Sequence, residues 1–335
     1  MKAIAKTQPG IGIDTIDLPY PQLSSNSVII KTIACGICGA DLEVYMGRLS
    51  KFGTLPMILG HEFTGEIVEI GEQVEGYNLK DEVVVQPFTG MCGNCYYCTT
   101  GQPWSCSSRR MLGGLAEYVA VPAINLYRIP SNISAYEATL CDPFAVAAHA
   151  LHIAGFKLLD TAVVLGPGPI GLMTSMALKH AGASLVIVTG TNNDVSPRLE
   201  LASRIADTII NIDAEDPVPK VKELTSGLGV DIVFDTTGSQ QAGPQGIYML
   251  KTKGKLVIIG HYPNNMALAD PSYKGYSIIG NVSYNWETWE RFIPYLTQRS
   301  VDLEQFISHK LPFDDATAGF ELARSKKSLK VLLVP

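Results

Sequence analysis

Four cysteines lie close together between residues 92 and 106, with the spacing C-x2-C-x2-C-x7-C. They are Cys92, Cys95, Cys98 and Cys106. Steps of this length let successive thiolates turn toward one ion, and Gly93, Asn94 and Gly101 permit the tight backbone that this requires. Four thiolate ligands leave no open coordination position, so the spacing predicts a structural zinc site rather than a catalytic one. An iron–sulfur cluster is the alternative, because it also uses closely spaced cysteines.

A second candidate metal site has mixed ligands. Cys38 lies in the motif Gly-Ile-Cys-Gly-Ala-Asp at residues 36–41, and His61 lies in a Gly-His-Glu motif that ends at Glu62. A cysteine, a histidine and a carboxylate from separate loops leave room for water or substrate on the ion, which is typical of catalytic zinc. The third protein ligand is either Glu62 or Asp142.

Asp142 interrupts an apolar stretch, and an unpaired buried carboxylate would be costly there. A role as metal ligand explains this position. A helix N-cap explains it as well, with Pro143 at the first helical position. The two interpretations are compatible, so the sequence leaves both open.

A glycine-rich motif of the form G-x-G-x-x-G follows an apolar segment at residues 161–165. Its glycines are suited to a tight turn, to close approach of a pyrophosphate and to packing of a helix on a strand. The motif therefore predicts a dinucleotide-binding turn. The residues expected to contact the coenzyme here are Gly166, Gly168, Pro169, Ile170 and Gly171.

The end of the next predicted strand bears on coenzyme preference. An NAD site usually has an acid there, but this chain has Gly190, followed by Thr191 and Asn192. This neutral turn, with Arg198 a few residues further on, favours NADP because no charge would repel a 2′-phosphate. Asp194 is close enough to take the acidic role, which keeps NAD as the alternative.

The elements that must position these residues fall into two parts. Residues 1–130 are rich in short β-type segments, and residues 134–154 have a helical pattern. Apolar strands then alternate with helical segments, which predicts a parallel sheet with helices on both faces and an α/β class overall. The strands are expected at 161–165, 184–189, 207–212, 231–235, 255–259 and 277–282. A last apolar strand at 329–334 is expected to join the β core of the first part.

Composition limits the classes of partner. The chain has 335 residues, 46% hydrophobic and 17% charged, with a net charge of −6 and no basic run. These values argue against nucleic acid or an anionic membrane as a partner. Neither a signal-peptide region nor an apolar stretch of membrane-spanning length is found. Seven cysteines arranged for metal suit a reducing compartment, so the cytoplasm is the expected location.

Taken together, these motifs resemble the zinc-containing medium-chain dehydrogenase/reductase superfamily, which includes the alcohol dehydrogenases, on the branch of sorbitol (polyol) and threonine dehydrogenases. The resemblance spans nearly the whole chain. It rests on G-I-C-G-x-D at 36–41, G-H-E at 60–62, the four cysteines, the acid–Pro pair at 142–143, G-x-G-P-I-G at 166–171 and V-I-I-G at 257–260.

The resemblance implies a GroES-like catalytic domain at residues 1–148 and 286–335, with a zinc lobe at about 90–108, and a Rossmann NAD(P)-binding domain at 149–285. It implies reversible oxidation of a small alcohol or polyol by NAD or NADP, two zinc ions per chain, and a homodimer or homotetramer. Cys38 and His61 would bind the catalytic zinc, with Glu62 and Asp142 as the ligand or water-holding carboxylates. The four clustered cysteines would bind the structural zinc, and Gly260 would contribute to coenzyme binding.

Two positions depart from the family. Ala40 stands where the family has Ser or Thr in its proton relay, and Glu43 stands where many members have His. The substrate proton must therefore leave through another group, and Glu43, Glu62 or Asp142 are candidates acting through water. Asp41 is expected to orient a metal ligand. These departures disfavour threonine as substrate.

Two other functions fit parts of the pattern. One is a zinc-free enone reductase of the same superfamily, which Cys38, His61 and the four-cysteine lobe argue against. The other is a non-enzymatic NAD(P)-binding protein, to which Ala40 gives some support. Metal content separates the first from a zinc enzyme, and turnover with a panel of alcohols separates the second.

Overall fold

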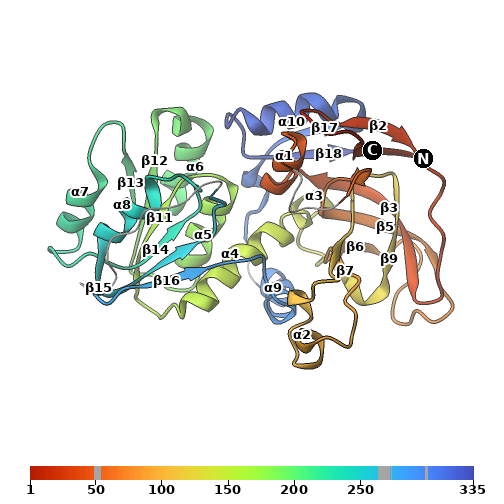
Figure 1. The fold of residues 1–335 in the computed structure, drawn as a ribbon, viewed down its shortest axis with the longest axis horizontal. Coiled ribbons are helices and arrows are strands. Elements are labelled where there is room, and N and C mark those ends of the chain that lie inside the picture. Colours follow the sequence, from red (N-terminus) through yellow and green to blue (C-terminus); the bar gives the residue numbers. More distant parts are fainter. Residues whose placement is uncertain (49–53, 263–271, 273, 299–300) are drawn as a thin grey trace. The chain divides into compact units, whose positions relative to one another are not determined.

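A computed structural model describes residues 1–48, 54–262, 272, 274–298 and 301–335 (Figure 1). The chain forms two compact units. Unit 1 comprises Met1–Asp142 and Asn285–Pro335, and unit 2 is the continuous segment Pro143–Tyr284. Each unit has its own sheet and its own core, so each is described by itself.

The main sheet of unit 1 has seven strands in the order β10-β6-β5-β3-β18-β17, with β9 also paired to β3. Only β17 and β18 run parallel; the other pairs are antiparallel. The strands are β3 (Ser27–Gly36), β5 (Glu62–Ile70), β6 (Glu82–Val85), β9 (Tyr118–Pro122), β10 (Leu126–Arg128), β17 (Ile307–Pro312) and β18 (Lys330–Val334). The last strand of the chain therefore lies beside β3, which confirms its predicted destination.

Smaller elements complete unit 1. The sheet β2-β1-β4 consists of β1 (Lys2–Lys6), β2 (Asp14–Asp17) and β4 (Met57–Ile58), and a second small sheet pairs β7 (Phe88–Thr89) with β8 (Arg110–Met111). The helices are α1 (Gly39–Tyr45), α2 (Tyr96–Thr99), α3 (Ala135–Ala138), α9 (Trp286–Gln298) and α10 (Ala316–Arg324). Short 3-10 turns lie at Pro103–Ser105, Ala123–Asn125, Glu304–Phe306 and Phe313–Asp315.

The core of unit 1 is built from strands rich in β-branched and aromatic residues, which suit a pleated and buried surface. Residues far apart in the chain meet in it, because β18 inserts next to β3. Its members include Ile4, Val28, Ile30, Phe63, Ile67, Val83, Phe320, Val331 and Leu333. The apolar character of β18 is thereby explained by burial.

Unit 2 contains a six-stranded, fully parallel sheet in the order β13-β12-β11-β14-β15-β16. Numbered along the chain, this is the order 3-2-1-4-5-6 of dinucleotide-binding sheets. The strands are β11 (Thr161–Leu165), β12 (Leu185–Gly190), β13 (Thr208–Asn211), β14 (Val230–Asp235), β15 (Leu250–Ile258) and β16 (Ser277–Gly280). The helices are α4 (Cys141–Ala154), α5 (Pro169–His180), α6 (Glu200–Ile205), α7 (Pro217–Leu224) and α8 (Ala242–Met249), with shorter turns at Asn192–Asp194 and Val195–Leu199.

The predicted parallel strands are all present, and the strand at 161–165 has the predicted bounds. The largest difference is at β15, which begins at Leu250 rather than at residue 255. Val230 pairs with Leu250, and the regular ladder resumes only at Ile232 and Lys255. Lys253, between these two pairs, has φ of 61°. This irregular start interrupts the alternation of apolar and polar residues, so the pattern does not predict the first residues of β15.

None of the helices in the described part of the chain is long and apolar enough to cross a membrane.

Candidate functional site

Cys38, His61 and Glu62 form one group in unit 1, with possible ligand atoms that all lie within 4.8 Å of one another. The pairing of β3 with β5 brings them together, because Gly36 at the end of β3 is opposite Glu62 at the start of β5. Cys38 follows β3 and stands at the N-cap position of α1. The sheet register thus joins the two motifs that the sequence separates.

Two glycines make this approach possible. Gly60 has φ of 77°, and a Cβ there would lie 2.4 Å from the sulfur of Cys35. A Cβ on Gly36 would lie 2.4 Å from Oε2 of Glu62. Any larger residue at either position would collide with the buried chain, so the glycines of both motifs are required by packing around the site.

Asp41 connects the two backbone segments that carry Cys38 and His61. Its carboxylate accepts hydrogen bonds from the backbone N–H of Cys38 at 2.9 Å and of Gly60 at 3.0 Å. Oδ1 of Asp41 also lies 3.7 Å from Nδ1 of His61, with both side chains buried. Burial lowers the pKa of His61, but Cys38 and Asp41 outweigh it and raise that pKa well above its usual range. This geometry fits the predicted role of Asp41 in orienting a ligand.

Glu62 makes a buried ion pair that the sequence analysis missed. Its carboxylate pairs with Nζ of Lys330 in β18, and the two side chains are 0% and 4% exposed. Lys330 also donates to the backbone oxygen of Ile37 at 3.1 Å. Burial lowers the pKa of Lys330, but Glu62 and Cys38 outweigh it and raise that pKa. A lysine at the start of a strand predicted to be buried was the signal, because it needs a buried anion.

Asp142 is buried but lies outside the group of three ligand atoms. The helix α4 begins at Cys141, so Asp142 occupies the first turn and the predicted N-cap position is wrong. The reason is that the helix starts two residues before Pro143, which a first turn tolerates. The Asp142 carboxylate contributes to the raised pKa of Lys330, so it acts on the same buried cation as Glu62.

Glu43 is engaged elsewhere. Its carboxylate accepts two hydrogen bonds from Arg48, with Nε–Oε2 at 2.5 Å and Nη2–Oε1 at 2.7 Å. The Arg48 side chain is 54% exposed and that of Glu43 is 29% exposed. The Glu43 carboxylate is thus already engaged at both oxygens by one guanidinium.

The donor set of the three-residue group fits zinc. A thiol, an imidazole and a carboxylate are the ligands that zinc binds, and three protein ligands leave one position open. Nδ1 of His61 is buried and lies 3.7 Å from Asp41, which leaves Nε2 as the nitrogen that would bind an ion. The three side chains could therefore hold one ion.

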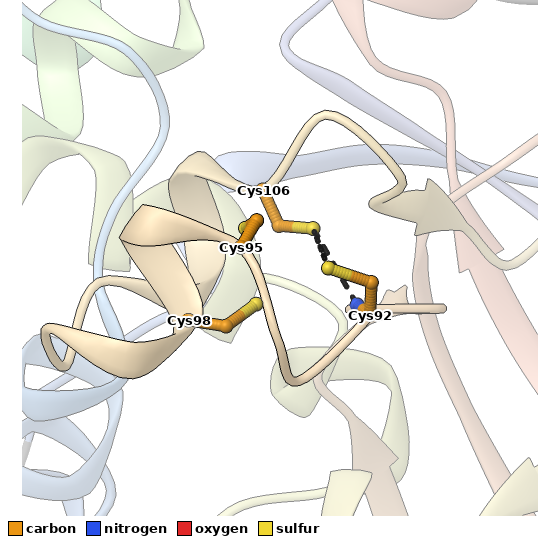
Figure 2. A group of neighbouring side chains, drawn as sticks. All are labelled: Cys92, Cys95, Cys98 and Cys106. Atoms are coloured by element: carbon orange, nitrogen blue, oxygen red, sulfur yellow. Dashed lines mark hydrogen bonds between the residues drawn. The ribbon is translucent and has the colours of Figure 1, made fainter.

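The four clustered cysteines form the second candidate metal centre (Figure 2). Their sulfurs all lie within 4.8 Å of one another, and all four cysteines are free thiols. Cys92 and Cys95 come from the turn that leads into α2, Cys98 lies within α2, and Cys106 follows the 3-10 turn Pro103–Ser105. Cys92 and Cys106 have sulfurs 3.6 Å apart, and the backbone N–H of Cys92 points to the Cys106 sulfur at 3.5 Å.

The charge balance of this cluster fits a cation. The backbone N–H of Cys92 lowers the pKa of Cys106 to about 6, whereas burial and the neighbouring thiols raise that of Cys98 to about 12. Four adjacent sulfurs therefore resist ionising together unless a positive charge is present. Four thiolates around one ion, with no open position, describe a structural zinc site.

The glycine-rich turn of unit 2 has the geometry of a pyrophosphate site. Gly166 has φ of 92°, and Gly168 is the N-cap of α5. A Cβ on Gly168 would meet nothing within 4 Å among the described residues, so its backbone is open to a ligand. A Cβ on Gly171 would lie 2.0 Å from the Gly166 oxygen, so α5 can pack on β11 only with glycine there. Pro169 and Ile170 form the first turn of α5 between them.

The neighbouring strand ends close the same edge of the sheet. Thr236 after β14 donates from Oγ1 to the Leu165 oxygen at 2.8 Å, and so fixes the start of the glycine turn. A Cβ on Gly260 after β15 would lie 2.3 Å from the backbone nitrogen of Gly238. The loops that follow β14 and β15 are therefore in backbone contact. The strand order reverses between β11 and β14, so the glycine turn after β11 and the loop after β14 flank the reversal point.

The loop after β12 carries the residues expected to set coenzyme preference. Asp194 accepts hydrogen bonds from the backbone N–H and the hydroxyl of Thr191, at 3.0 and 2.7 Å. It also pairs with the buried Arg198 at 3.6 Å. Asp194 thus faces its own loop, and Arg198 already has an anion beside it.

Two protein-family models match the chain. The model described as alcohol dehydrogenase GroES-like domain matches residues 24–131, and the model described as zinc-binding dehydrogenase matches residues 169–298. The first match lies within unit 1.

Curated relatives match over the whole chain. A sorbitol dehydrogenase of Halalkalibacterium halodurans is 33% identical, with 100% of this chain and 99% of the relative covered. An L-threonine 3-dehydrogenase of Proteus mirabilis is 34% identical, with 99% of each covered. A D-arabitol-phosphate dehydrogenase of Enterococcus avium is 31% identical, with 99% of this chain and 97% of the relative covered.

Solved structures of similar proteins cover the full chain. The 2R,3R-butanediol dehydrogenase of Bacillus subtilis has a TM-score of 0.89 at 28% identity, covering 100% of this chain and 99% of its own. A zinc-binding dehydrogenase of Sinorhizobium meliloti bound to NADP has a TM-score of 0.88 at 26% identity and the same coverage. An alcohol dehydrogenase of Escherichia coli complexed with NADH has a TM-score of 0.89 at 28% identity, again with that coverage.

Proposed function

We propose a function for this chain from the premise that it belongs to the zinc-binding dehydrogenases that carry an alcohol dehydrogenase GroES-like domain. It is an NAD(P)-dependent oxidoreductase that interconverts an alcohol or polyol and the corresponding carbonyl compound. The relatives named for sorbitol, arabitol phosphate and butanediol support a polyol, a sugar or a secondary alcohol as the substrate class.

The single observation that carries this proposal is the mixed group of Cys38, His61 and Glu62. A ligand set with one open position belongs to chemistry, whereas the four-cysteine set is closed. We assign this group to the catalytic domain proposed at residues 1–148 and 286–335. The coenzyme is assigned to the domain proposed at 149–285, through the glycine turn.

The overall reaction transfers a hydride from the carbinol carbon to the nicotinamide and releases a proton from the hydroxyl group. Zinc held by Cys38, His61 and Glu62 would polarise the substrate oxygen and lower its pKa. Asp41 keeps the Cys38 loop and the His61 turn in register through its two backbone hydrogen bonds. The protein thereby contributes placement and electrostatics, and the coenzyme contributes the redox chemistry.

The three candidate proton acceptors have different environments. Glu43 is paired with Arg48, and Glu62 is paired with Lys330. We therefore assign the third zinc ligand to Glu62, whose oxygen lies in the group, and proton acceptance through water to Asp142. Lys330 is the cation common to both carboxylates, since Glu62 and Asp142 each help to raise its pKa.

The test is a panel of polyols, sugars and secondary alcohols, each assayed with NAD and with NADP by the absorbance of the reduced coenzyme. We expect turnover with at least one class of vicinal diol or polyol, loss of turnover on zinc chelation, and recovery on adding zinc. Reduction of enones by zinc-free protein would instead support the zinc-free reductase. Coenzyme binding without turnover on any substrate would support a non-enzymatic NAD(P)-binding protein.

The assembly and the location remain predictions. All seven cysteines are free thiols, which supports a reducing compartment such as the cytoplasm. The homodimer or homotetramer expected from the family is checked by light scattering of the zinc-loaded protein.

A further inference from the structure

The carboxyl end of β12 is where a dinucleotide site reads the ribose that carries a 2′-hydroxyl in NAD and a 2′-phosphate in NADP. In this chain β12 ends at Gly190 and leads into Thr191 and Asn192. The sequence favours NADP there, because no acid occupies the strand end. The structure gives a different reason for the glycine.

Gly190 is closely packed. A Cβ at this position would lie 2.8 Å from Cδ2 of Leu199 and 3.1 Å from Cγ of Pro167. A larger side chain at the end of β12 would therefore press on both neighbours. Packing thus offers an explanation of the glycine that does not depend on the charge of the coenzyme.

An acid reaches the same loop from the adjacent strand. Gly190 is paired in register with Asn211 of β13, and the N–H of Ile212 donates to the Gly190 oxygen at 2.9 Å. The next residue, Asp213, accepts a hydrogen bond at Oδ2 from the backbone N–H of Asn192 at 2.7 Å. The parallel register thus delivers a carboxylate to the loop in which the expected acid is missing.

The Asn192 side chain is also fixed by β13. Nδ2 of Asn211 donates to Oδ1 of Asn192 at 2.8 Å. Asn192 is therefore held at both its backbone and its side chain by the end of β13, and it stays beside Asp213. Asn192, Asn211 and Asp213 all lie where solvent or a ligand can reach them, since none of them is buried.

The remaining charges of this loop do not favour a phosphate. Arg198 is the cation expected to bind it, but its side chain is only 10% exposed and pairs with Asp194 at 3.6 Å. These two charges offset each other inside the loop. Asp213 then leaves a net negative charge at the surface of the loop, where a 2′-phosphate would have to sit.

We propose that Asp213 sets coenzyme preference in this chain, by accepting a hydrogen bond from the ribose 2′-hydroxyl of NAD and repelling the 2′-phosphate of NADP. The preferred coenzyme is NAD. This inference rests on the proposed function, because it needs a dinucleotide on the glycine turn of unit 2. It differs from the preference indicated by the neutral turn, since the acid comes from the end of β13.

The test measures the dissociation constants of NADH and NADPH by fluorescence titration of the zinc-loaded protein without substrate. We expect NADH to bind at least tenfold more tightly than NADPH. In Asp213→Asn this ratio should fall about tenfold, which corresponds to about 1.4 kcal/mol, mostly through tighter NADPH binding. Asparagine keeps an oxygen that can accept from Asn192, so the loop should keep its structure.

The matched control is Glu215→Gln, which removes one negative charge two residues further along the same exposed segment. It should leave the ratio unchanged. A wild-type preference for NADPH, an unchanged ratio in Asp213→Asn, or an equal shift in Glu215→Gln would each overturn the role of Asp213. Failure of the wild-type protein to bind either coenzyme would instead contradict the proposed function, so the two failures are distinguishable.

Discussion

At the scale of single residues, Lys330 supplies the buried positive charge next to the mixed-ligand group. It lies in β18, 268 residues after Glu62 in the sequence. It is the buried cation that both Glu62 and Asp142 act on. Two carboxylates and a thiol would be costly to bury together without it. Lys330 supplies the opposite charge that offsets this cost.

We predict that Glu62→Gln and Asp142→Asn change different properties, because the two carboxylates have different roles. Glu62→Gln should lower zinc content from about two to about one ion per chain, because the open site loses a ligand. Asp142→Asn should keep about two zinc ions while kcat falls by about 100-fold or more, because a proton acceptor is lost. Metal analysis and steady-state kinetics measure both effects.

Glu62→Gln also leaves Lys330 unpaired, which can destabilise the protein by about 3–5 kcal/mol. The double variant Glu62→Gln with Lys330→Met removes that buried charge and serves as the control. Low zinc in the double variant, despite a recovered melting temperature, would support the ligand role. Full zinc in both Glu62 variants would assign the third ligand to Asp142 instead.

Residue types and spacing predict which side chains can bind metal, but not how they are paired. The C-x2-C steps and the Gly-His-Glu motif were sufficient to predict both metal groups, because thiols and imidazoles in such spacing have few other uses. The environment of Glu43 was not predictable, since its engagement by Arg48 depends on how α1 ends. The packing around Gly190 was not predictable for a similar reason, because its neighbours Leu199 and Pro167 come from two other segments.

At the scale of elements, the glycine turn and the parallel strands divide the work in unit 2. The strands fix the position of the turn, and the turn leaves its backbone open at Gly168 while it closes at Gly171. The same motif therefore contains one glycine for a ligand and one for packing. Substitution can separate these two demands.

We predict that Gly168→Ala weakens coenzyme binding by about tenfold or more, with little change in melting temperature. Its Cβ would meet no protein atom, and its φ of −68° suits alanine, so only a ligand would feel the added methyl group. Gly171→Ala should weaken coenzyme binding and also lower the melting temperature, because its Cβ would collide with the Gly166 oxygen. Fluorescence titration measures coenzyme binding by both variants, and thermal unfolding measures their melting temperatures. Equal melting temperatures in the two variants would contradict the prediction.

A second prediction concerns Asp231, which ties three strands together. Its carboxylate accepts hydrogen bonds from the N–H and hydroxyl of Thr161 in β11, at 3.0 and 2.8 Å, and pairs with Lys251 in β15. Burial raises the pKa of Asp231, but Lys251 and Thr161 outweigh it and lower that pKa. A depressed pKa means that the stabilisation is present above the unfolded pKa of about 3.9 and is lost as the pH falls below it.

Asp231→Asn should therefore lower the free energy of unfolding by about 1–2 kcal/mol at pH 7. The difference from wild type should shrink as the pH falls from about 5 toward about 3. The free energy of unfolding is measured for both proteins at each pH. Effects of acid on other groups are common to both proteins and cancel in the difference. A difference that is constant over this range would show that the carboxylate charge is not involved.

Hydrophobic alternation predicts the existence of strands better than their pairing. All six parallel strands were expected, because apolar segments of strand length alternate with helical ones. The start of β15 and the start of α4 were not predicted. Alternation does not encode the positive φ of Lys253 or the helical turn that precedes Pro143.

At the scale of the whole molecule, the two metal groups have different tasks within unit 1. The mixed group is built on the central sheet, while the four-cysteine lobe is a loop segment with only α2 and one 3-10 turn. A segment with so little secondary structure needs another source of stability, and a structural metal supplies it. The consequence is a lobe whose order depends on zinc.

We predict that Cys106→Ser lowers zinc content from about two to about one ion per chain and lowers the melting temperature. Cys141→Ala is the matched control, because Cys141 is a buried thiol outside both metal groups, and it should keep about two zinc ions. Metal analysis and thermal unfolding, with and without a chelator, provide the measurements. Iron in place of zinc, with a visible cluster spectrum, would contradict the assignment.

The position of β18 also has a consequence for the order in which the protein is made. The ribosome supplies unit 2 as one continuous run, before β17 and β18 exist. At synthesis rates of about 5–20 residues per second, the end of β3 and the core around Phe63 wait on the order of tens of seconds for Val331 and Leu333. During that interval apolar surface stays uncovered and Glu62 lacks its lysine. The half that contains both candidate metal groups is thus completed last, and it is the half of the nascent chain most exposed to aggregation.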